Sequence, residues 1–121
     1  MAAAAANQRS RYHLVMSIAV PLEDLPAALV DYAWGYLITV GDDLRGRTLA
    51  VPTVIDDGVL RCVAGERTRQ FAAARPEVTL VFPPAAGTGY SLIVDGVAEV
   101  TVDGVDVRPT WAVRHRPALA Q

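Results

Sequence analysis

The sequence predicts a single, mainly β domain: a small barrel accompanied by short helices. Three observations carry this prediction. The length of 121 residues suits one domain. Short runs rich in Val, Ile, Leu and Thr fill most of the chain, and turn residues separate them. Several runs, such as residues 36–38 and 92–94, are apolar on both faces, so the outside of the barrel needs a helix or a second subunit to cover it.

Two helices and a tail are predicted around the strands. Residues 1–11 are mostly alanines followed by polar residues, and we expect a mobile tail, which leaves residues 12–121 as the single domain. Apolar positions recur at three and four residues over residues 22–33, which predicts an amphipathic helix with Pro26 in its first turn. Residues 67–75, ended by a proline, predict a second helix. Strands are expected at residues 35–40, 47–55, 59–63, 78–82, 90–94 and 97–102.

Turns and strand breakers refine this arrangement. Asp57-Gly58 and Asp103-Gly104 are typical of β-hairpins. Pro52 lies inside a predicted strand, so an ordinary hydrogen-bond ladder is not expected on one side of it. Gly96 divides the run of residues 90–102 and predicts a bulge or a sharp bend. Each irregularity marks either a barrel corner or strand edge, or a place where a ligand or second chain approaches the backbone.

Composition excludes several classes of function. The net charge of −2 gives no reason to expect nucleic acid or an acidic membrane as a partner. The chain has no lysine, which excludes Schiff-base chemistry on lysine, and the single cysteine excludes an internal disulfide and a cysteine metal cage. The longest uncharged stretch, residues 14–22, is too short to cross a bilayer. We therefore expect a cytoplasmic protein.

No catalytic group is evident from spacing. His13 and His115 lie near opposite ends of the chain, and neither belongs to a metal-ligand pattern, so no metal site is predicted. The acidic residues cluster in turns, where they satisfy local backbone groups. Cys62 lies in a predicted strand and is expected to be a small core residue. The catalytic residue therefore stays open.

The arginines are more informative. Arg47 begins a predicted strand, and Arg67, Thr68 and Arg69 begin the second predicted helix. A helix start offers free N–H groups and a positive dipole end, and phosphate suits the guanidinium fork. This pattern predicts an anion site, with a solvated cluster of arginines facing Glu66 as the alternative.

The segment containing these arginines resembles the pyridoxamine 5′-phosphate oxidase-like family. The resemblance is carried by RTLAVPTVIDDGVLRCVAGERTR at residues 47–69 and PEVTLVFP at residues 76–83, and it covers about residues 22–107. It implies a six-stranded antiparallel split β-barrel that forms a homodimer. It also implies FMN or the deazaflavin F420 in the groove between subunits, and an oxidoreductase acting on a small-molecule substrate.

The resemblance also assigns roles to residues. It places Arg47 on the flavin phosphate and has the group at residues 67–69 complete that phosphate site. The backbone of residues 48–51 lies along the ring, and Ser91 reaches the cofactor from the partner subunit. The predicted cofactor-binding residues are therefore Arg47, Thr48, Leu49, Val51, Val63, Arg67, Thr68, Arg69 and Ser91.

The sequence departs from the family pattern at several positions. Pro52 occupies the place of a family lysine, and Val63-Ala64 replaces a Tyr-Thr pair that packs on the flavin in the oxidase itself. The C-terminal motif that holds the vitamin phosphate is absent, so we do not expect a true pyridoxamine-phosphate oxidase. The alternative to an oxidoreductase is a split-barrel dimer without cofactor, acting as a binding or structural module. FMN and F420 are not distinguished, and the substrate is not identified.

Overall fold

The computed structural model describes residues 16–84 and 89–118; the predicted tail, residues 1–11, lies outside them. The elements in chain order are β1 (Ser17–Ala19), η1 (Leu22–Asp24), α2 (Leu25–Leu29), β2 (Trp34–Val40), β3 (Gly46–Asp56), β4 (Val59–Val63), α3 (Glu66–Ala74), β5 (Glu77–Phe82), β6 (Ser91–Val100) and β7 (Gly104–His115). The predicted class is confirmed: the described chain is mainly β, with two short α-helices.

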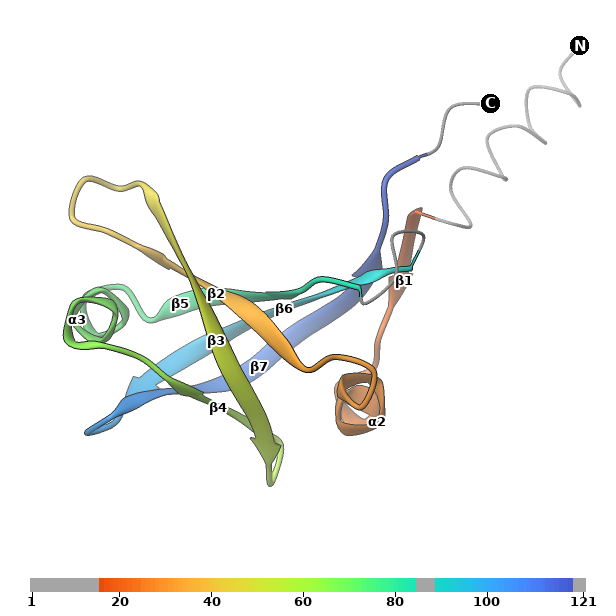
Figure 1. The fold of residues 1–121 in the computed structure, drawn as a ribbon, viewed down its shortest axis with the longest axis horizontal. Coiled ribbons are helices and arrows are strands. Elements are labelled where there is room, and N and C mark those ends of the chain that lie inside the picture. The colour runs from red at the N-terminus through yellow and green to blue at the C-terminus, as the bar shows by residue number, and fades with distance from the viewer. Residues whose placement is uncertain (1–15, 85–88, 119–121) are drawn as a thin grey trace, which may run out of the picture.

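Six strands form a closed antiparallel barrel. The strand order is β7-β4-β3-β2-β5-β6, and pairing of β6 with β7 closes the circle. The short strand β1 extends the sheet along β7, where Ala19 pairs with Val113. Figure 1 shows α3 at one end of the barrel, and α2 and β1 toward the other. Helix α3 contacts β2, β6 and β7, so it covers one end of the barrel.

The core fills the inside of this barrel. Because successive side chains of a strand point to opposite faces, every second residue of β2 and β5 is buried. Helix α2 adds Leu25 and Ala28 to the core. The largest fully buried side chains are Phe82, Leu25, Leu37, Leu60, Leu80, Leu92, Val51, Val94, Val105, Val107 and Thr39.

The first predicted helix is shorter than its apolar pattern suggests. Residues 22–33 contain a 3₁₀ turn and then α2, which ends at Leu29, with Pro26 in its first turn as predicted. The hydroxyl of Tyr32 donates a hydrogen bond to the carbonyl of Tyr90 at 2.7 Å, and its ring lies 6.1 Å from that of Phe82. These two contacts fix the position of Tyr32, which lies between the end of α2 and the start of β2. The second helix, predicted at residues 67–75, is α3 with a shift of one residue.

The strands at the C-terminal side differ from the prediction. The two expected strands at residues 90–94 and 97–102 are one strand, β6, and the sixth barrel strand is β7, which the sequence analysis did not identify. The register shifts between Asp95, opposite Trp111, and Gly96, opposite Pro109, so Thr110 is an extra residue on β7. The bulge predicted at Gly96 is thus confirmed.

The two predicted hairpins are present. Asp57 and Gly58 both have positive φ, 51° and 76°, which is the conformation that an Asp-Gly turn supplies between β3 and β4. Between β6 and β7, the N–H of Thr101 donates to the carbonyl of Gly104 at 2.9 Å. These turns determine which strands become neighbours in the barrel.

Candidate functional site

The barrel is split along one side of β3. Residues 46–52 of this strand pair with β2, whereas residues 53–56 pair with β4 on the opposite edge. Within the described residues, no strand pairs with the β4-side edge of residues 46–52. Pro52 lies where the partner changes, which confirms that its ladder is not an ordinary one. A row of backbone N–H and C=O groups is therefore left free of strand partners.

The split opens the interior of the barrel to solvent. Leu49 lies directly opposite Leu37, so both side chains point to the inside of the barrel. Leu37 is fully buried, but Leu49 is 39% exposed. Val51, two residues further along β3, is buried again. Of the predicted residues on this strand, Leu49 thus offers a side chain to the opening, whereas Val51 offers only its backbone.

Arg47 lies at the start of the split and is held by the turn before it. Its Nη2 lies 2.6 Å from Oδ2 of Asp43, and both side chains are about half exposed. The backbone N–H of Arg45 donates to the Asp43 carboxylate at 3.1 Å and, together with Arg47, lowers the pKa of that carboxyl. Leu44, at the tip of this turn, has a positive φ of 63°. The guanidinium therefore has a defined position, while part of it stays accessible.

The first turn of α3 carries the other predicted arginines. Its N-cap is Gly65, which offers no side chain to cap the first-turn N–H groups. Arg67 is exposed and has no ionic or hydrogen-bond partner among residues 16–84 and 89–118. Arg69 differs, because its Nη1 donates to the carbonyl of Ala64 at 2.7 Å. Thr68 is half-buried between them.

Helix α3 spans from the end of β4 to the turn before β3. Two residues separate its start from the end of β4, and Arg75 at its C-terminal end lies 3.3 Å from Asp42 in the turn before β3. Figure 1 shows β3 and β4 diverging from their shared hairpin, with α3 beyond the end of β4. Of the predicted residues, Arg47, Thr48, Leu49 and Val51 therefore lie on the part of β3 that borders the split, whereas Arg67, Thr68 and Arg69 lie in the first turn of α3, at the end of the helix opposite to Arg75.

Val63 lies at the end of the split, beside a hollow. Its side chain is 65% exposed, and a hollow of about 380 Å³ lies next to it. Pro52, Val54 and Val63 supply apolar side chains to its lining, and Arg61, Asp103 and Asp106 supply charged ones. Position 63 can thus offer an apolar contact to a flat molecule that lies along β3.

Ser91 is not brought to this split. It begins β6 and pairs with His115 at the end of β7, which also pairs with Ser17 of β1. In Figure 1, β1 and α3 lie at opposite ends of the molecule, so the serine is remote from α3 in one copy of the chain. His115 Nδ1 lies 3.0 Å from Ser17 Oγ. The sequence analysis set His115 aside because it belongs to no metal-ligand pattern. Its proximity to two serines could not be predicted, because it depends on the register of β7, a strand that was not predicted.

The expectation that Cys62 is a core residue agrees with the structure. Cys62 is buried, and burial raises the pKa of its thiol, as expected for a core residue and not for a nucleophile. In residues 16–84 and 89–118, no three metal-ligating side chains gather into a group. None of the described helices is long and apolar enough to span a membrane.

Comparison with known proteins identifies relatives and a fold. No family model matches the chain. An uncharacterised protein of Mycobacterium bovis and one of Mycobacterium tuberculosis are each 45% identical to it over 116 residues, which cover 82% of this chain and 82% of the relative. The chain belongs to the family of these mycobacterial proteins.

Solved structures extend the comparison to the fold of this mycobacterial family. An F420 reductase has 20% identity and a TM-score of 0.60, covering 70% of this chain and 93% of that one. An FAD-binding protein from Mycobacterium smegmatis has 21% identity and a TM-score of 0.60, covering 83% and 99%. An FAD-binding protein from Mesorhizobium loti has 14% identity and a TM-score of 0.64, covering 82% and 96%. The split-barrel fold is therefore shared with flavin- and deazaflavin-binding proteins.

Proposed function

We propose that this protein binds a flavin-type cofactor, FMN or the deazaflavin F420, along the split and acts as an oxidoreductase on a small molecule. One observation carries the proposal: part of β3 has an edge without a strand partner, with the half-exposed Arg47 at its start and the exposed, inward-facing Leu49 along it. Proteins with this fold that bind FAD, and one named for F420, support it. A cofactor of this type supplies the hydride chemistry, and the protein supplies position and electrostatics.

The chemistry of the split fits both ends of such a molecule. Unpaired backbone N–H and C=O groups along residues 47–51 can hydrogen-bond the polar edge of a flat heterocycle. Arg47, Arg67 and the uncapped N–H groups of α3 can hold a phosphate, with Thr68 adding a hydroxyl donor. Leu49 and Val63 can contact the ring through exposed apolar surface. Arg69 can take part only by leaving Ala64 or by sharing its guanidinium with it.

The proposal includes a homodimer. Tyr36, Val81 and Ile93 lie side by side on the outer face of β2, β5 and β6, and Trp34 is 41% exposed nearby on β2. Such an apolar outer surface favours a second copy as its cover. A second copy would also supply Ser91 to the cofactor. Sedimentation equilibrium should give twice the chain mass of 12.9 kDa at micromolar concentration, and a monomer mass would refute the dimer.

Cofactor titration of single variants tests the site. Arg47→Ala and Arg69→Ala should each weaken binding of the preferred cofactor by about 2–3 kcal/mol, because a charge-assisted hydrogen bond to phosphate is lost. Arg47→Lys should weaken it less, since the ammonium keeps the charge but loses the fork. Arg45→Ala is the matched control: its exposed side chain is two residues away, and its removal should leave binding unchanged.

Two results would contradict the proposal. Tight binding that survives Arg47→Ala combined with Arg69→Ala would refute the phosphate site but not the fold. Failure of both FMN and F420 to bind the wild-type protein at high micromolar concentration would instead favour a split-barrel dimer without cofactor. Thermal unfolding of each variant separates these results from loss of structure, which matters most for Arg69→Ala because its bond to Ala64 is lost as well.

A further inference from the structure

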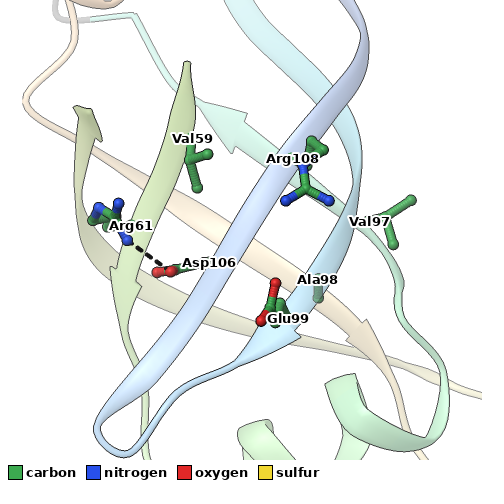
Figure 2. A pocket seen from close by; sticks show the side chains of 7 residues that line it. All are labelled: Val59, Arg61, Val97, Ala98, Glu99, Asp106 and Arg108. Atoms are coloured by element: carbon green, nitrogen blue, oxygen red, sulfur yellow. Dashed lines mark hydrogen bonds and ion pairs between the residues drawn. The ribbon is translucent and has the colours of Figure 1, made fainter. Parts of the chain in front are cut away.

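A second hollow lies on the outer face of the barrel and shares Arg61 and Asp106 with the hollow beside Val63. It measures about 380 Å³ and is formed by β4, β7 and β6. Figure 2 shows two arginines, two acids and apolar side chains around it. Its lining residues are Val59, Arg61, Val97, Ala98, Glu99, Asp106 and Arg108. This volume is at the small end of the range for ligand pockets.

One pair of charges in this hollow is already neutralised. Arg61 Nη1 lies 2.7 Å from Asp106 Oδ2, and its Nε lies 3.3 Å from Asp56 Oδ2. Figure 2 shows the bond between Arg61 and Asp106 across β4 and β7. This arginine is therefore occupied by two carboxylates and is not available to a ligand.

The other pair is left without partners. Among the described residues, neither Arg108 nor Glu99 makes an ion pair or a side-chain hydrogen bond. The strand register explains this: Arg108 lies directly opposite Val97, whereas Glu99 lies directly opposite the carboxylate of Asp106. Like charges directly opposite each other destabilise a sheet, and an arginine opposite a valine gains no ion pair.

The spacing of these groups defines a chemical class of ligand. Arg108 and Glu99 are diagonal neighbours on β7 and β6, so their side chains approach one hollow from adjacent positions. A carboxylate would be held by the guanidinium fork of Arg108, and an ammonium would be held by the carboxylate of Glu99. Val59 and Val97 form apolar walls beside the arginine. We propose that this hollow binds a small zwitterion with an apolar body, namely an α-amino acid with a short aliphatic side chain.

Titration of the full chain with L-valine, followed by NMR chemical shifts, tests this proposal. Valine should give saturable shifts of residues in β4, β6 and β7. Arg108→Gln and Glu99→Gln should each weaken binding at least tenfold, because each removes one charge-assisted contact. Arg45→Gln and Glu23→Gln, which remove exposed charges elsewhere, are the matched controls and should bind as the wild type does.

Two truncated probes show whether both charges of the ligand are needed. 3-Methylbutanoate lacks the ammonium, and isobutylamine lacks the carboxylate, so each should bind at least tenfold more weakly than valine. Equal binding of 3-methylbutanoate would show a simple anion site and overturn the proposal. So would the absence of saturation at about 20 mM valine, or wild-type affinity in both variants. None of these results depends on the cofactor proposed for the split.

Discussion

The two sides of the barrel differ in how completely their strands are paired. In the wall formed by β5, β6 and β7, strand β6 has a partner on both edges over most of its length, and its inward residues Leu92 and Val94 are fully buried. On the side of β3, each residue has a strand partner on one edge only, β2 for residues 46–52 and β4 for residues 53–56, and Leu49 faces the interior yet remains exposed. The wall thus supplies stability, while the split leaves backbone and side chains free to bind.

Truncation of two leucines that face each other tests this difference most strongly. Leu37→Ala should lower the free energy of unfolding by about 3 kcal/mol, because it leaves a cavity in a fully buried position. Leu49→Ala, directly opposite on β3, should cost about 1 kcal/mol, since solvent already reaches its side chain. Urea denaturation measures both values. Equal losses would show that the split is closed in solution.

A pair of glycines, one in the wall and one on the split strand, gives a second comparison. A Cβ at position 96 would lie 2.6 Å from the carbonyl oxygen of Arg108, so Gly96→Ala should destabilise the wall by about 2–3 kcal/mol. At Gly46, on the split strand, the nearest atom would be a methyl of Ile38 at 3.7 Å. Gly46→Ala should therefore be neutral or slightly stabilising. Comparable melting temperatures for the two variants would contradict the bulge geometry.

The smallest effect concerns two threonines. Thr39 lies opposite Arg47 on the inner face, and its buried hydroxyl has no hydrogen-bond partner among the described residues. Thr39→Val should raise the free energy of unfolding by about 1 kcal/mol, because the unpaired hydroxyl is removed. In the wall, Thr79 donates to Asp95 at 2.7 Å, so Thr79→Val should lower it by about 1 kcal/mol. A destabilising Thr39→Val would show that this hydroxyl has a partner, such as a buried water.

Elements with local signals were predictable from the sequence. The Asp57-Gly58 hairpin and the helix before Pro76 were identified because their turn and end residues act through the nearest backbone. Strand β7 was missed because its alternation is interrupted where Pro109 and the extra residue Thr110 form the bulge. A pattern of period two cannot show such an insertion, since the partner strand decides which residue is extra.

The features of the candidate site likewise divide into those that local sequence signals predict and those that depend on the folded structure. The sequence identified Arg47 and the start of α3 because a strand start and a helix start are local features. It could not show that Arg69 donates to Ala64, or that one chain keeps Ser91 away from the split. The hollow of Arg108 and Glu99 was equally out of reach, because its residues come from three strands whose alignment depends on the bulge.

The pairing of β7 also constrains how the chain folds during synthesis. This strand lies beside β4, β6 and β1, so it joins residues that are up to 98 positions apart in sequence, as in the contact of Ser17 with His115. The barrel cannot close until residues near position 115 have left the ribosome. Contacts between such distant positions make folding slow compared with that of helical proteins of similar length. Nascent chains that lack β7 would expose the inner faces of β4 and β6. Chaperones bind exposed apolar surface of this kind.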